Sequence, residues 1–411
     1  MPSRAGRPAV VLGLRPAGLA VARALAHEGV PVAGIALGRD EWGLASRHLL
    51  RRWRIYEPDT DRRDDRVVEA LAELARHGRP VVIPEIDKAV AVIVRRWEDV
   101  TAVADVPLPA DPDTVRRLAL KDTLLAEAER AGVQTPRTVV PENEDAVRSA
   151  ELPLPFLVKP VESEEYARHF TRKVVVAHDI EDAVEAWRTA HAAGFAVVLQ
   201  ERIPGRDRVF SLFAYIGREG EPLASVVGRK LRQIPPDFGS STVFRLEREP
   251  RVLELGQRLL ASSSYRGFAH VEFVHDARSD SFRLLEVNTR LPVWAGIAMR
   301  PGWDVARLAY EDLIGAGPAP LGTLDHSGIW VYAVKDAWVV AGMAWRRELG
   351  VRDVVAPYRD PRRVGAVLAR DDVRPALAFV RWAGGLALRR SARRLLRLRV
   401  PTRRERATDA S

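Results

Sequence analysis

The sequence predicts a fold that combines α/β and α+β regions, with a doubly wound parallel sheet at the N-terminal end. Its 411 residues exceed what one ordinary hydrophobic core accommodates, so two or three packed domains are expected. The first hundred residues alternate strand and helix patterns, which is typical of a parallel sheet covered by helices. Further along, two alternating apolar runs separated by a polar turn indicate an antiparallel hairpin.

The N-terminal alternation begins with a buried strand, a helix and a second strand. A longer helix, a third strand and another helix follow. We predict these elements over 10–14, 17–27, 30–37, 66–76 and 81–83, with the last helix beginning near Glu85.

The first strand-to-helix turn carries Gly13 and Gly18, which raises the question of a dinucleotide site. Their spacing is not that of the G-x-G-x-x-G fingerprint. The nearest acid after the second strand, Asp40, comes late for a ribose contact. We therefore interpret the turn as one that packs helix against sheet, and an NAD-dependent oxidoreductase as a poor fit.

The middle of the chain is predicted to contain helices and groups of consecutive strands. A helix is predicted first, then a strand, an irregular loop and a strand, and then a helix followed by three strands. A long helix, the hairpin and a closing helix complete the region. The corresponding ranges are 113–131, 156–177, 181–192, 197–201, 209–215, 223–227, 251–262, 268–274, 282–287 and 303–313.

Composition narrows the functional classes. Hydrophobic residues make up 47% and charged residues 29% of the chain, as in folded globular proteins. The absence of cysteine excludes disulfides, thiolate catalysis and Cys-type zinc sites. We find no signal-peptide core and no uncharged apolar stretch of about 18 residues, so we expect a cytoplasmic protein.

The net charge of +9 is concentrated in the C-terminal tail. Ten Arg and two acids between Arg381 and Ser411 account for +8 of it. The rest of the chain is close to neutral, so we expect no nucleic-acid partner. The composition of the tail predicts one of two structures. It is either a solvated Arg-rich helix that packs on the body or an amphipathic helix in weak contact with an anionic membrane.

The hairpin carries a cluster of residues suited to phosphate chemistry. Its first strand contains Glu272, and its second contains Glu286, Asn288 and Arg290. Because side chains alternate along a strand, the last three share one face. Two carboxylates and an amide offer oxygen ligands to Mg²⁺, and an Arg beside them can stabilise a transferred phosphoryl group. The alternative is an exposed face with ordinary salt bridges.

Lysine is rare in this chain, with six among 64 basic residues. Each lysine is therefore a candidate for a site that needs a compact positive charge. Lys159 ends an apolar strand just before a proline, where it can bind phosphate oxygens. Gln200 and Glu201 end another apolar strand before Ile203-Pro204-Gly205. A turn of that kind can offer backbone groups to an adenine.

The order of these residues resembles the ATP-grasp superfamily. It runs from Lys121 and Lys159 through 200–205 to the hairpin cluster, over residues 8 to 318. The surrounding sequence, including 229–239, is most similar to the carboxylate–amine ligase group that contains the D-aspartate ligases. The resemblance implies an ATP-grasp architecture in which two α+β lobes enclose the nucleotide after the N-terminal sheet. The domains would be 1–110, 111–202, a metal-binding lobe at 203–320, and a C-terminal extension at 321–411.

The resemblance also implies a role for each motif residue. The cofactors would be ATP and Mg²⁺, with Mn²⁺ as a substitute. Phosphates would contact Lys121 and Lys159, with Lys173 near the covering loop, and the adenosine would contact Gln200, Glu201, Ile203 and, through its ribose, Asp207. The metal ligands would be Glu272, Glu286 and Asn288, and the catalytic residues Arg290, Lys230 and Arg232.

One segment departs from the family pattern. Residues 161–170 contain no glycine, whereas many superfamily members carry a glycine-rich lid over the phosphates after the equivalent of Lys159. The expected function is an ATP-dependent ligase that couples a small-molecule carboxylate to an amine. The alternative is an inactive ATP-binding regulatory protein of the same fold. Whether the chain forms a homodimer is left open.

Overall fold

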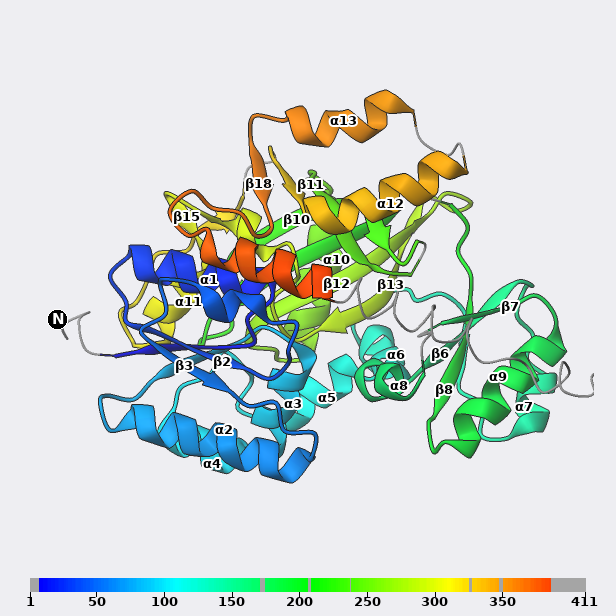
Figure 1. The fold of residues 1–411 in the computed structure, drawn as a ribbon. Helices are drawn as coiled ribbons and strands as arrows, with labels where there is room; N and C mark the ends of the chain where they lie inside the picture. The colour runs from blue at the N-terminus through cyan, green and yellow to red at the C-terminus, as the bar shows by residue number, and fades with distance from the viewer. Residues whose placement is uncertain are drawn as a thin grey trace, which may run out of the picture.

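The N-terminal part of the computed structural model is a four-stranded parallel sheet in the order β3-β2-β1-β4 (Figure 1). The model describes residues 7–170, 174–205, 208–236, 238–324, 327–346 and 350–385. The strands are β1 (Ala9–Leu12), β2 (Val32–Ala36), β3 (Arg51–Arg54) and β4 (Val81–Pro84).

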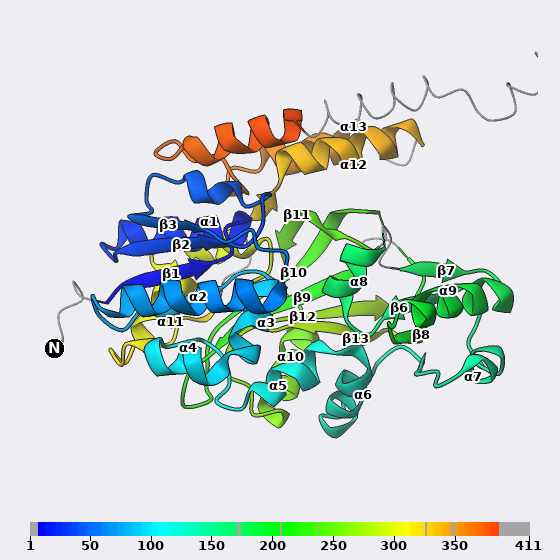
Figure 2. The ribbon, with the colours of Figure 1, turned by 60° about the horizontal axis from the view of Figure 1, so that its bottom comes forward.

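Helices cover both faces of this sheet (Figure 2). On one face Val11 of β1 packs in the same core as α1 (Pro16–His27), and on the other Val10 packs with α2 (Thr60–Ala75) and α3 (Asp87–Arg95). Strands buried on both faces explain the continuous apolar runs in the sequence. The predicted doubly wound sheet is confirmed. The short helices η1 (Trp42–Ala45) and α4 (Trp97–Val103) complete this part.

Strand β3 was missed by the sequence analysis because Arg51-Arg52-Trp53-Arg54 has no apolar run. It is an edge strand, largely exposed, that pairs in parallel with β2. Backbone hydrogen bonds hold it in place, and its charged side chains are the usual protection of an exposed sheet edge.

A second, smaller sheet with the order β5-β8-β6-β7 stands to one side of the molecule (Figure 1). Its strands are antiparallel, and α7 and α9 pack on it around a core of their own. The elements are β5 (Thr138–Val139), α7 (Glu144–Arg148), β6 (Phe156–Pro160), α8 (Ser163–His169), β7 (Val175–Ala177), α9 (Ile180–Ala192) and β8 (Val197–Glu201).

Two predictions in this region were wrong in detail. The single helix expected over 113–131 is split into α5 (Pro112–Ala119) and α6 (Lys121–Arg130), because Leu120 has an extended backbone with ψ 135°. This break places Lys121 at the first position of α6. The loop expected after β6 contains α8, whose Tyr166 packs its ring against Phe170 and Phe195.

The third sheet is the largest, with the order β13-β12-β9-β10-β11-β17-β18 and β16 paired to β10. Helix α10 packs on one face, and α1 and α11 pack on the other. The elements up to the hairpin are β9 (Val209–Ile216), β10 (Pro222–Ile234), β11 (Ser240–Leu246), α10 (Pro250–Ser262), β12 (Gly267–Asp276) and β13 (Ser281–Asn288). Those after it are η2 (Ala295–Ala298), β14 (Met299–Arg300), β15 (Trp303–Asp304), α11 (Val305–Leu313), β16 (Gly322–Thr323), β17 (Ile329–Val331) and β18 (Arg363–Gly365).

The weakly patterned C-terminal region folds back over the body. Strands β17 and β18 extend the large sheet, and α12 (Ala333–Trp345) lies across β10 and β11, followed by α13 (Val351–Arg359). No helix in the described part of the chain is long and apolar enough to cross a bilayer. Most of the basic tail lies outside the described residues, which end at residue 385.

Candidate functional site

The hairpin β12–β13 brings its acidic and amide side chains together. Glu272 lies directly opposite Glu286 in the strand register, and His270 lies opposite Asn288. Asn288 donates from Nδ2 to Glu286 Oε1 at 3.0 Å, and its Oδ1 accepts from Arg290 Nη2 at 3.2 Å. The three residues that were expected on one face are therefore in contact with one another.

Glu272 is buried but keeps its negative charge. Lys230 of β10 reaches both of its oxygens, at 2.7 and 2.8 Å, although β9 lies between the two strands. Burial raises the pKa of Glu272, but Lys230 and then His270, 3.2 Å away, outweigh it and hold that pKa well below its usual range. The carboxylate is thus available as an anionic ligand at any physiological pH.

Two lysines interact through their charges, and one of them, Lys159, also interacts with this acidic cluster. Lys159 of β6 donates to Gln200 Oε1 at 2.6 Å, and Lys121 at the start of α6 donates to Ser163 Oγ at 2.9 Å. Burial, followed by the charge of Lys121, lowers the pKa of Lys159 to about 8, while Glu286 and Glu272 act in the opposite direction. Charges from the small sheet and the hairpin therefore act on one another across a shared space.

An open cavity of about 370 Å³ adjoins this space. Three of the residues that were expected to contact adenosine, Gln200, Glu201 and Ile203, line it. Leu157, Leu285 and Met343 add apolar surface, and Lys159 and Arg232 also contribute. The cavity therefore combines apolar walls with several polar and charged groups, as small-molecule sites do.

Both carboxylate oxygens of Glu201 are occupied by hydrogen bonds within the protein. It accepts from Arg278 Nη2 at 2.7 Å and from the backbone N–H of Arg137 at 3.3 Å. Burial alone would raise the pKa of Glu201. The hydrogen bonds from Arg278 and from the Arg137 backbone outweigh burial, so the pKa of Glu201 lies below its ordinary value. With its side chain occupied in this way, Glu201 would contact an adenine through backbone groups at the end of β8.

Arg290 is held by a residue that the sequence analysis missed. Asp87, at the start of α3, accepts a bidentate pair from Arg290 Nε and Nη2 at 2.6 and 2.7 Å. Burial opposes the charge on Arg290, but Asp87 more than compensates and raises its pKa. Asp87 follows β4 at the carboxyl edge of the parallel sheet, where α/β folds bind ligands, and that position was the available signal.

Two further acids at this edge were also missed. Glu41 accepts from the backbone N–H groups of Leu14 at 2.9 Å and Leu37 at 3.0 Å, and Glu85 accepts from that of Arg15 at 3.1 Å. Burial, together with the charge of Glu85, raises the pKa of Glu41 to about 8. These carboxyl groups occupy the helix N-terminus that would bind a dinucleotide phosphate, in agreement with our interpretation of the glycine turn.

Arg232 is paired with a buried carboxylate of the C-terminal region. Its guanidinium forms a bidentate pair with Asp336 of α12, with both distances 2.7 Å, and both side chains are buried. Thr242 and Tyr358 also donate to Asp336. These contacts make Arg232 an anchor for α12, and its expected catalytic role stays a prediction. Lys173 and Asp207 lie outside the described residues.

Comparison with known proteins gave matches among solved structures only. No family model matches the chain, and no curated protein sequence matches it. An N5-carboxyaminoimidazole synthetase of Staphylococcus aureus, in complex with ADP, superposes with a TM-score of 0.62 at 13% identity, over 79% of this chain and 81% of that one.

Two further structures show the same architecture. The biotin carboxylase domain of the Hydrogenobacter thermophilus 2-oxoglutarate carboxylase, in complex with MgADP, ADP and bicarbonate, gives a TM-score of 0.61 at 16% identity, over 79% and 73% of the chains. The L-amino acid ligase of Bacillus licheniformis gives 0.57 at 15% identity, over 76% and 75%. At these identities the likeness establishes the fold, and the fold class predicted from the sequence is confirmed.

Proposed function

We propose that this chain, which has the ATP-grasp fold, is a ligase that activates a carboxylate with Mg-ATP and joins it to an amine. One observation carries the proposal. The charge of Lys159 interacts with those of Lys121, Glu286 and Glu272, and Lys159 lines a cavity of about 370 Å³. Cations and oxygen ligands beside a cavity with apolar walls match the needs of a magnesium–triphosphate with a flat base.

The binding roles follow from position. Lys159 and Lys121 would bind phosphate oxygens as point charges. The backbone at Glu201 and the walls formed by Gln200 and Ile203 would hold the adenine. Lys173 and Asp207 remain predictions for the phosphate-covering loop and the ribose.

The donor set of the hairpin fits magnesium. Glu272 and Glu286 supply carboxylate oxygens and Asn288 an amide oxygen, which is the hard, oxygen-only and incomplete set that Mg²⁺ or Mn²⁺ accepts alongside phosphate. When bound, the ion neutralises charge on the β- and γ-phosphates.

The reaction has two displacements. A carboxylate oxygen attacks the γ-phosphorus, the bond from that phosphorus to the bridging oxygen breaks, and ADP leaves an acyl phosphate behind. The amine nitrogen then attacks the acyl carbon, the carbon–oxygen bond to phosphate breaks, and the nitrogen loses a proton. Arg290, which is paired with Asp87, would stabilise charge on the transferred group, and Lys230 would balance the charge of Glu272. Exclusion of water protects the acyl phosphate.

Substrate screening would identify the carboxylate and the amine and would test membership of the D-aspartate ligase subgroup. The purified chain should release ADP from Mg-ATP only when a suitable carboxylate is present, and hydroxylamine should trap the acyl phosphate as a hydroxamate. A panel of amino acids, other small carboxylates and bicarbonate would be screened. Mg-ATP at about 100 times its dissociation constant should also stabilise the fold by roughly 2.7 kcal/mol.

The outcomes separate the two functions under consideration. Binding of Mg-ATP without ADP release or hydroxamate across the panel would favour the regulatory ATP-binding alternative. A folded protein that binds neither ATP nor ADP would contradict both.

Nucleotide affinity should depend on pH through Lys159. Its pKa of about 8 in the free protein lies below the ordinary value because of burial and Lys121. Anionic phosphates favour the charged lysine, so binding above about pH 8 requires proton uptake. Affinity for Mg-ATP should fall by about half between pH 7 and 8, and above pH 8 by up to about tenfold per pH unit.

The matched variant for this test is Lys159→Arg, which keeps a positive charge throughout the range. Titration calorimetry of both proteins between pH 7 and 9.5 should show a flat profile for the variant, at whatever affinity it has. An equally steep decline in the variant would assign the pH dependence to another group.

A further inference from the structure

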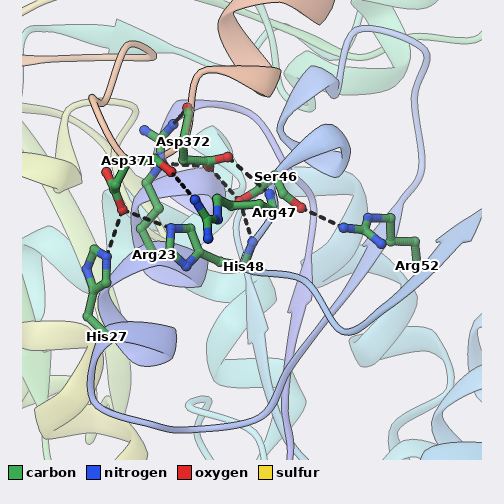
Figure 3. Close-up of polar contacts among 8 residues, drawn as sticks. All are labelled: Arg23, His27, Ser46, Arg47, His48, Arg52, Asp371 and Asp372. Carbon is green, nitrogen blue, oxygen red and sulfur yellow. Dashed lines mark hydrogen bonds and ion pairs between the residues drawn. The ribbon is translucent and has the colours of Figure 1, made fainter.

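A cluster of two histidines and a carboxylate lies on the N-terminal part of the molecule, outside the ligase site (Figure 3). His27 is the last residue of α1, His48 lies between η1 and β3, and Asp371 belongs to the C-terminal region. Both Nε2 atoms point to the same oxygen, Asp371 Oδ2, at 2.9 Å from His27 and 3.0 Å from His48. Three separate segments thus present their ligand atoms to one point.

We propose that His27, His48 and Asp371 form a binding site for a divalent transition-metal ion of the zinc class. One ligand atom from each residue lies within 4.8 Å of the others. Ligands bound to zinc at about 2.0 Å in a tetrahedron are about 3.3 Å apart, so small movements convert the observed contacts into coordination. Two imidazoles and one carboxylate leave the fourth position to water. Imidazole ligands select such ions over Mg²⁺, which separates this site from the hairpin.

The surrounding contacts hold these ligands in position. Asp372, which is buried beside Asp371, accepts from Ser46 Oγ at 2.6 Å, from the Arg47 backbone N–H at 3.0 Å and from Arg23 Nε at 3.0 Å (Figure 3). These bonds attach the C-terminal segment to α1 and to the segment that carries His48. Fixed neighbours of this kind orient metal ligands and raise their affinity.

Access and local charge are compatible with an ion from solvent. The side chains of His27 and Asp371 are 57% and 47% exposed, whereas that of His48 is 15% exposed. Two cations lie beside the cluster: Arg23, which is paired to Asp372, and Arg47, whose Nη1 donates to the Asp371 carbonyl at 3.4 Å. Their positive charge reduces affinity, so we expect moderate rather than very tight binding.

The site would connect regions that are distant in the sequence. Residues 27 and 371 are 344 positions apart, and the C-terminal region that follows β17 also contains α12, which lines the cavity through Met343. A bound ion would clamp that region to the N-terminal sheet and so stabilise the folded protein.

The test uses the full chain, freed of metal with a chelator and then titrated with ZnCl₂ in the absence of nucleotide. Calorimetry should show one zinc equivalent, and Co²⁺ should give the visible absorption of a low-coordinate histidine site. His48→Ala should weaken zinc binding by on the order of 100-fold, and so should His27→Ala, while His77→Ala, at an exposed histidine elsewhere, should have no effect.

Two results would overturn the proposal. One is the absence of zinc binding to the wild type, which would leave the cluster as a pair of hydrogen bonds to Asp371. The other is equal zinc affinity in wild type, His48→Ala and Asp371→Asn. Far-UV circular dichroism of each variant checks folding. The assay for ADP release is independent of this result, because none of the three ligands belongs to the ligase site.

Discussion

Glu286→Gln should reduce the rate of acyl-phosphate formation by on the order of 10²- to 10³-fold, with little change in stability. Glutamine has the same shape and keeps an oxygen that can accept from Asn288 Nδ2. It lacks the charge that opposes Lys159 and that would bind the metal. The loss should therefore appear in chemistry, measured as hydroxamate formed per unit time at saturating Mg-ATP.

The matched control for this variant is Glu254→Gln on α10, whose side chain is 73% exposed and lies away from the hairpin face. It makes the same chemical change without altering the site, so its rate should equal that of the wild type. A wild-type rate in Glu286→Gln would remove this residue from the proposed metal site. Raising the Mg²⁺ or Mn²⁺ concentration should partly restore the variant if the defect lies in metal affinity.

Arg232→Met should lower the free energy of unfolding by about 3–5 kcal/mol. Asp336 is fully buried, and its pair with Arg232 is bidentate at 2.7 Å. Removing the guanidinium leaves a buried carboxylate whose remaining donors, Thr242 and Tyr358, are neutral. Chemical denaturation followed by tryptophan fluorescence would measure the change.

Two variants test the physical cause. Tyr358→Phe removes one hydrogen bond to Asp336 and should cost about 1 kcal/mol. The double variant Arg232→Met/Asp336→Leu removes both charges, and it should be more stable than Arg232→Met alone. A loss in Arg232→Met no larger than that in Tyr358→Phe would contradict a central role for the ion pair.

The single variant Arg232→Met should also affect the nucleotide site. Helix α12 carries Asp336 and also lines the cavity with Val339 and Met343. If Arg232 anchors this helix, Arg232→Met should weaken Mg-ATP binding even where the protein remains folded. If Arg232 instead acts directly in catalysis, as the resemblance implies, Arg232→Met would lower the catalytic rate with α12 in place.

Local patterns made much of the fold predictable from the sequence. The N-terminal sheet was predicted because β1, β2 and β4 are short apolar runs separated by helical patterns. The hairpin was predicted because alternation and a polar turn are both local signals. Strand β3 and the split between α5 and α6 escaped prediction, because an Arg-rich edge strand and a single extended residue have little periodic signal.

By itself, the sequence determined the fold class and the order of the lysines, acids and arginine proposed for the site, since these depend on residue type and spacing. The tertiary structure decided which distant groups meet them. Arg290 meets Asp87 across 203 positions, Arg232 meets Asp336 across 104, and His27 meets Asp371 across 344. Such contacts depend on how separate elements pack. A pairing between single residues on two elements repeats nowhere along the chain, so it produces no periodic pattern from which it could be predicted.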